Sequence, residues 1–87
     1  MKLKNIRDEI DRIDGKVFSL LKERLRLVIA TLDIREDLED ISREEQILRS
    51  IDEISDDDNE KKYLTDTYSS VFKSGKQIKN RIKNKIS

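Results

Sequence analysis

One apolar stripe that contains a single arginine constrains the fold of this chain more than any other feature. Its members alternate in steps of four and three residues: Ile6, Ile10, Ile13, Val17, Leu20, Arg24, Leu27, Thr31, Ile34 and Leu38. That spacing keeps every member on one side of an α-helix, and faces of this kind pack against other helices. Arg24 is therefore expected to point into a helix-lined interior. Because an unpaired buried cation is costly, Arg24 requires an anion there, supplied by the protein or by a ligand.

The composition favours a single, nearly all-helical domain over residues 1–87. The chain has no proline, two glycines and 44% charged residues, and no run of alternating β-branched and aromatic residues predicts a strand. Cysteine and histidine are both absent, which excludes disulfides and catalytic Ser-His or Cys-His pairs and removes the usual zinc ligand. The sequence therefore offers no thiolate chemistry and no histidine-based catalysis.

Net charge and hydropathy limit the kinds of partner that the chain is expected to bind. The net charge is zero, which argues against a dedicated nucleic-acid binder. No apolar run approaches the ~20 residues that span a bilayer, and no signal peptide precedes the first predicted helix. We expect a cytoplasmic protein without a membrane or nucleic-acid partner.

The first of three predicted helices runs from about Asn5, a plausible N-cap, to about Asp37. It passes through Gly15, because the periodicity does not change there. At ~1.5 Å per residue this helix would be about 50 Å long, more than two ordinary helices cover in one globule. A second copy of the chain is the simplest cover, so the sequence predicts an intertwined homodimer.

The second helix is predicted from near Asp40 or Ile41 to near Ile54, with Ser42 and Glu45 as an alternative capping box one turn later. Its inward face carries Asp40, Glu44, Ile47, Ile51 and Ile54. An acidic turn over residues 55–59 leads to a third helix, from about Glu60 to about Lys83. The inward face of that helix carries Leu64, Tyr68, Val71, Gly75, Ile78 and Ile82, flanked by Phe72 and Lys79.

Charged residues from all three predicted helices are candidates for one anion-binding interior. The cations are Arg7, Arg24, Arg35, Arg43 and Lys79, and the carboxylates are Asp40 and Glu44. Arg24 and Arg35 are eleven residues apart, so on a continuous helix they share nearly one face, ~16 Å apart. Structural explanations stay open, because Arg35 can pair with Glu39 on the helix surface and Arg24 with Glu44 in a buried ion pair.

Three segments resemble the all-helical chorismate mutases. Residues 6–14 read IRDEIDRID and residues 20–24 read LLKER, similar to the family's opening Arg-x-x-Ile-Asp-x-Ile-Asp and Leu-Leu-x-x-Arg. Residues 40–44, DISRE, resemble the Asp-x-x-Arg-Glu that begins the family's second helix. The resemblance covers most of the chain and is weakest over the third helix. It implies an intertwined homodimer of three-helix chains with one long first helix, in agreement with the length argument.

The resemblance implies a reaction, the Claisen rearrangement of chorismate to prephenate that leads toward phenylalanine and tyrosine. This reaction is unimolecular and needs no nucleophile, metal or redox cofactor. The substrate is a dicarboxylate that must be held in a folded conformer. Negative charge develops on the ether oxygen as its bond breaks, so preorganised cations aimed at that oxygen stabilise the transition state.

The resemblance also assigns roles to residues that match the family's motifs. Arg24 would bind one substrate carboxylate, and Arg7 would bind a carboxylate in the site of the other subunit. Asp40 and Glu44 match positions that hydrogen-bond the ring hydroxyl. Arg43 matches an arginine beside them.

Three further residues depart from the family's usual pattern. Arg35 stands where a lysine normally contacts the ether oxygen and a carboxylate, and arginine changes that geometry. Lys79 stands where glutamine or glutamate commonly points at the same oxygen. Gly75 stands where a small hydroxyl residue often lies, and it leaves room for a closely packed helix or for a ligand. The connection before the second helix is about four residues shorter than usual and lacks the family's proline.

Two other functions are compatible with the same residues. The first is an isochorismate-pyruvate lyase on the same scaffold, although Asp40 and Glu44 suit the ring hydroxyl of the mutase substrate. The second is a catalytically silent helical dimer with a regulatory role, in which Arg24 would pair with Glu44. The shortened connection between the first two helices favours that second alternative.

Overall fold

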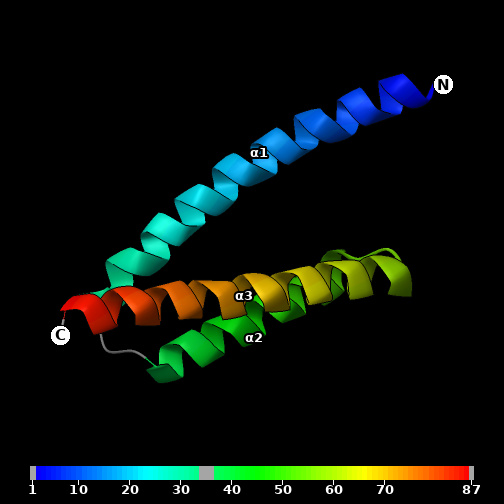
Figure 1. Cartoon of the computed structure of the whole chain (residues 1–87). Coiled ribbons are helices and arrows are strands. Elements are labelled where there is room, and N and C mark those ends of the chain that lie inside the picture. Colours follow the sequence, from blue (N-terminus) through cyan, green and yellow to red (C-terminus); the bar gives the residue numbers. More distant parts are fainter. Residues whose placement is uncertain (1, 34–36, 87) are drawn as a thin grey trace. The chain divides into compact units, whose positions relative to one another are not determined.

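The computed structural model describes residues 2–33 and 37–86, with side chains for residues 2–32 and 41–85. These residues form α1 (Leu3–Ala30), a short 3-10 helix η1 (Thr31–Asp33), α2 (Asp37–Ile54) and α3 (Asp58–Ile86) (Figure 1). The described ranges contain no strand, so the predicted all-α class with a long first helix is confirmed. None of their helices combines the length and the apolar character that a membrane crossing requires. The chain divides into two compact units, Met1–Thr31 and Leu32–Ser87.

α1 is one uninterrupted helix of 28 residues, which confirms the predicted passage through Gly15. A Cβ atom placed on Gly15 would meet no described heavy atom within 4 Å. Packing within the described chain therefore does not explain a glycine here, although glycine in a helix interior costs about 1 kcal/mol relative to alanine.

The predicted start of the first helix at Asn5 is wrong by two residues. α1 begins at Leu3, and Lys2 is the N-cap in an extended conformation, with no side-chain capping bond. The carbonyl of Lys2 accepts from the N–H groups of Asn5 and Ile6 at 3.0 and 3.3 Å. Backbone bonds alone therefore begin this helix, and the capping that Asn5 was expected to supply is not used.

The predicted continuation of the first helix to Asp37 is also wrong, because α1 ends at Ala30. The hydroxyl of Thr31 donates to the carbonyl of Val28 at 2.6 Å, and the Thr31 N–H turns toward the same carbonyl. Threonine commonly competes with the helical hydrogen-bond ladder in this way, and the last turn tightens into the 3-10 helix η1. At ~1.5 Å per residue α1 is therefore about 42 Å long.

α2 begins at Asp37, earlier than predicted, and ends at Ile54 as predicted. Three of its first four residues are acidic, which suits the positive end of the helix dipole. The alternative capping box at Ser42 and Glu45 is wrong, because both residues lie inside the helix.

The acidic turn before α3 caps that helix. A carboxylate oxygen of Asp57 accepts from the N–H of Glu60 at 2.8 Å, and the Glu60 carboxylate accepts from the N–H of Asp56 at 3.4 Å. The first of these bonds satisfies an N–H that the first turn of α3 leaves without a helical partner, and the second ties the Asp56 backbone to the same turn. α3 therefore begins at Asp58, two residues before the predicted start, and continues to Ile86, with Lys83 and Lys85 in its last turn.

α2 and α3 form an antiparallel hairpin (Figure 1). Its most buried large side chains are Ile51 and Phe72, at 5% and 8% exposure, and Tyr68 packs edge-on against Phe72 with ring centroids 5.9 Å apart. These contacts confirm the inward faces that the apolar stripes predicted. Ile54 is an exception, because it lies at the end of α2 and is exposed.

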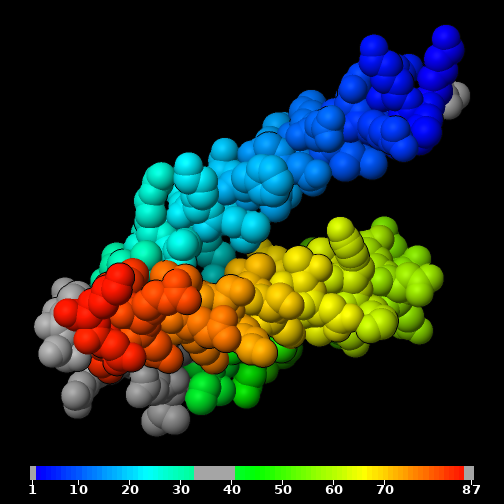
Figure 2. Space-filling view, viewed as in Figure 1, coloured from blue at the N-terminus to red at the C-terminus, as the bar shows by residue number. Residues whose placement is uncertain are grey.

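α1 makes up its unit without another helix, and it buries none of its residues. Figure 2 shows its side chains spread over the surface of a single helix. The apolar stripe residues on α1 have exposed fractions between 41% and 68%, namely Ile6, Ile10, Ile13, Val17, Leu20 and Leu27. A continuous exposed apolar face of this size marks a surface that packs against something further.

Candidate active site

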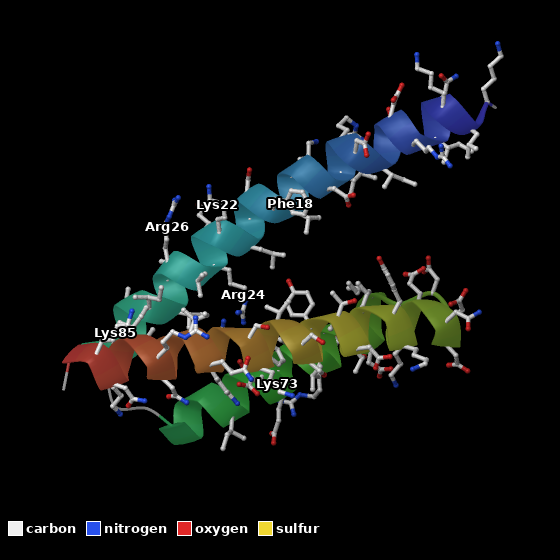
Figure 3. All side chains as sticks on the ribbon, in the orientation of Figure 1. Phe18, Lys22, Arg24, Arg26, Lys73 and Lys85 are labelled. Carbon is white, nitrogen blue, oxygen red and sulfur yellow. The ribbon has the colours of Figure 1, made fainter. Side chains whose placement is uncertain are left out.

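Arg24 is the cation of the α1 stripe, and its neighbours define which side of the helix it occupies. Figure 3 shows Arg24 leaving α1 on the side opposite to Lys22 and Arg26. Arg24 is half-buried, whereas Lys22 and Arg26 are exposed. The stripe predicted that Arg24 is buried, and the residue is half-buried.

Arg7 lies near the start of α1 and is exposed. Seventeen residues separate it from Arg24, which is about 25 Å along the helix axis and about 100° around it. One copy of α1 therefore cannot direct both guanidinium groups at the same small molecule.

Arg35 lies outside the described residues. Its predicted alignment with Arg24 assumed an unbroken helix between the two positions. Because α1 ends at Ala30 and passes into the 3-10 helix η1, that premise is wrong, and helical spacing no longer relates the two residues.

The hairpin of α2 and α3 places Glu44 opposite a lysine that sequence reasoning did not select. The ammonium nitrogen of Lys76 lies 3.1 Å from one carboxylate oxygen of Glu44 and 2.8 Å from the other. The Glu44 side chain is 25% exposed, while that of Lys76 is 53% exposed. This ion pair connects α2 to α3 across 32 positions of sequence.

Two other candidate residues lie close to Lys76 along α3. Gly75 directly precedes Lys76 and is buried, and Lys79 follows Lys76 by about one helical turn and is half-buried. The Lys76–Glu44 pair therefore joins α2 to the part of α3 that carries Gly75 and Lys79.

Asp40 and Arg43 are the remaining candidates on α2. Asp40 belongs to the helix four residues before Glu44, so the two positions share a helix face, and the Asp40 side chain lies outside the described ones. Arg43 is exposed and lies about 100° around the helix from Glu44. Of these two, only Asp40 occupies a position on the face that carries Glu44.

Two lysines of α3 outside the set of candidate residues have raised pKa values. The ammonium group of Lys61 on α3 lies 2.7 Å from Asp52 on α2, and its hydrogen bond and charge attraction to that carboxylate raise the pKa of Lys61 above 10.5. The pKa of Lys62 is raised in the same way by Asp66. Both pairs are exposed. The Lys61–Asp52 pair joins α2 to α3 near the turn of the hairpin, and the Lys62–Asp66 pair lies on the surface of α3.

Lys76 is the residue near the site that sequence reasoning missed, and a usable signal was present. Pairing the predicted faces of the second and third helices outward from the turn sets Glu44 level with Gly75. The next residue along the chain is Lys76, which has the length to reach across a helix pair. The apolar stripes alone do not reveal it, because Lys76 lies beside the stripe and not in it.

The arrangement supplies cations and carboxylates and no nucleophile of the kind that histidine activates. Such a set can hold an anionic molecule, accept a hydrogen bond from a hydroxyl through Glu44, and direct positive charge at an oxygen. These capacities suit a reaction that proceeds by conformational restriction and electrostatic stabilisation.

Comparison with known sequences agrees with this chemistry. The sequence model of one family, described as chorismate mutase type II, matches residues 6–80. That span includes all eight candidate residues and the helices that carry them. Comparisons with curated proteins and with solved structures gave no significant match. Because the family match extends over most of its length, the chain belongs to the type II chorismate mutase family.

Proposed function

We propose that this protein is a chorismate mutase that converts chorismate to prephenate. The observation that carries the proposal is the family match over residues 6–80, which contains every candidate site residue. The α2–α3 hairpin supports it, because the Lys76–Glu44 pair joins α2 to the part of α3 that carries Gly75 and Lys79. The two helical units would then act as one functional domain.

The proposed chemistry needs only groups that keep their charge through the reaction. Arg7 and Arg24 would bind the two carboxylates of chorismate and hold its enolpyruvyl group over the ring. Lys79 and Arg35 would direct positive charge at the ether oxygen, where negative charge develops as the carbon–oxygen bond breaks. No proton is transferred in this scheme, which is consistent with the absence of histidine and cysteine.

The carboxylates of α2 would recognise the ring hydroxyl. Glu44 can accept a hydrogen bond from that hydroxyl, and Asp40 shares its helix face one turn earlier. Arg43 would serve as a substrate-binding cation beside them. Gly75 would leave space for the substrate on the α3 side of the site.

The proposal includes a homodimer with shared active sites. Arg7 and Arg24 are about 25 Å apart along one helix, far more than the distance between the carboxylates of one chorismate molecule. An antiparallel pair of α1 helices would bring Arg7 of a second copy near the middle of the first. The same pairing would cover the exposed stripe of α1.

A turnover assay with matched arginine variants tests the proposal. The purified protein is mixed with chorismate, and prephenate is measured as the phenylpyruvate it forms in acid. Arg24→Ala should lower kcat/KM about 30- to 5,000-fold, because truncating one partner of a desolvated charge pair costs roughly 2–5 kcal/mol. Arg26→Ala removes the same charge from the opposite side of α1 and should leave turnover near the wild-type value.

Two outcomes would overturn the assignment. A wild-type protein that releases pyruvate from isochorismate, and forms no prephenate from chorismate, would be a lyase on the same scaffold. A protein that converts neither substrate, and whose melting temperature is not raised by chorismate, would be a catalytically silent dimer. Equal turnover by the Arg24→Ala and Arg26→Ala variants would refute the role of Arg24 alone.

A further inference from the structure

We propose that Lys76 is a positioning residue that orients Glu44 for the ring hydroxyl of the substrate. The inference rests on the proposed mutase function. Both carboxylate oxygens of Glu44 lie within 3.1 Å of the Lys76 nitrogen, so the ammonium group sits near the line that bisects the carboxylate. Because the ammonium group lies between both oxygens, the contact holds the Glu44 side chain toward α3 and restricts where its carboxylate can lie.

The contact leaves Glu44 with the capacity to bind a ligand. A carboxylate offers about four lone-pair positions, and one ammonium group occupies only part of them. The Glu44 side chain retains 25% exposure, so its outer edge stays accessible to a hydroxyl donor. Lys76 therefore takes the position between the two oxygens, and the lone pairs on their outer sides stay available for the substrate.

Preorganisation explains why such a contact matters for turnover. Glutamate has three side-chain torsions, and a substrate that must order them loses part of the benefit of the bond it forms. Lys76 orders them in advance. It also offsets the negative charge of Glu44, which would otherwise repel a substrate with two carboxylates.

Lys73 offers a matched control for this proposal. It lies on the same helix, about one turn before Lys76, and it is exposed. The variants Lys76→Met and Lys73→Met remove the same charge from α3 and keep a side chain of similar length. Lys76→Arg restores a cation at the position of interest.

The experiment compares kcat/KM for chorismate with kcat/KM for an analogue that lacks the ring hydroxyl. The ratio of the two values isolates the hydroxyl contact, because effects on folding or on carboxylate binding change both values together. In Lys76→Met the ratio should fall about tenfold, since small misplacements of a site group have effects of this order or larger. In Lys73→Met and Lys76→Arg it should stay within about twofold of wild type. In a Glu44→Gln background, Lys76→Met should cause no further fall.

The possible failures are distinguishable. A wild-type protein that converts neither compound refutes the mutase function and this proposal with it. An active protein whose ratio is unchanged in Lys76→Met refutes only the role of Lys76. An active wild-type protein that handles chorismate and the analogue equally well shows that Glu44 does not recognise the hydroxyl, which also overturns the role of Lys76.

Discussion

Replacing Leu27 by alanine tests whether the stripe of α1 is the surface that a second copy covers. Leu27 is the most exposed apolar residue of that stripe, at 68%. Full burial of a leucine stabilises by roughly 1.5–3 kcal/mol, so covering the exposed two thirds contributes about 1–2 kcal/mol in each copy. A symmetric dimer contains the residue twice, and Leu27→Ala should therefore weaken association by about 2–4 kcal/mol. This corresponds to an increase of about 30- to 700-fold in the dissociation constant of the dimer.

Sedimentation equilibrium over a range of protein concentrations measures that constant directly. Lys22→Ala is the control, because Lys22 leaves α1 on the side opposite to Arg24 (Figure 3). It also removes a long side chain and inserts the same alanine, so both variants change helix propensity only slightly. The control should associate as the wild type does. The reasoning is refuted if the wild type is monomeric at every concentration, or if Lys22→Ala weakens the dimer as much as Leu27→Ala does.

Three further perturbations test the fold. Gly15→Ala should stabilise α1 by about 0.5–1 kcal/mol and raise the melting temperature, because nothing described lies within 4 Å of the new methyl group. A lower melting temperature would show that a second chain packs there. Ile51→Ala should destabilise the hairpin by about 2–5 kcal/mol, measured by urea unfolding, whereas the exposed Ile54→Ala should cost much less. The pKa of Lys61 is raised in the folded chain, so the stability from its pair with Asp52 is present below pH 10.5 and is lost as the pH rises through the folded pKa. An NMR titration of the lysine side chains should show that Asp52→Asn lowers the pKa of Lys61, and an unchanged value would contradict the pairing.

The helices themselves were largely predictable because their periodicity is strong. The faces of α2 and α3 could be derived from apolar spacing, and buried Ile51 and half-buried Val71 lie where that spacing put them. The passage of α1 through Gly15 followed from the same signal. Periodicity reports which side of a helix packs, and it does so over many residues at once.

The end of α1 was not predictable from that signal, since the stripe continues past it. Thr31 lies in phase with the other members, and yet its hydroxyl bonds to the Val28 carbonyl and the helix changes geometry there. A local hydrogen bond of one side chain decided this boundary. The prediction that Arg24 and Arg35 align assumed an unbroken helix, and that premise does not hold because α1 ends at Ala30.

In the candidate site too, the sequence predicted the helix faces and did not predict the individual contacts. Sequence patterns selected Glu44 on α2 and Gly75 and Lys79 on α3, and the Lys76–Glu44 pair joins those parts of the two helices. The partner of Glu44 was missed, because a shift of one residue in helix register exchanges Gly75 for Lys76 at the point of contact. Which ion pair forms between two helices is therefore set by register and side-chain length, and hydrophobic pattern does not report either.

Two independent properties of α1 support the proposed second copy. The first property is the exposed apolar area of the stripe. The second is the distance of about 25 Å between Arg7 and Arg24, which follows from the geometry of the helix. Neither depends on the other, because the arginines would be equally far apart on a helix whose face was polar. If the same pairing satisfies both, then dissociation of the dimer removes a carboxylate-binding cation from each site at the moment it exposes the stripe. Activity per chain should therefore decline with dilution along the same curve as association, and Leu27→Ala should shift both curves together while Arg24→Ala lowers activity at all concentrations.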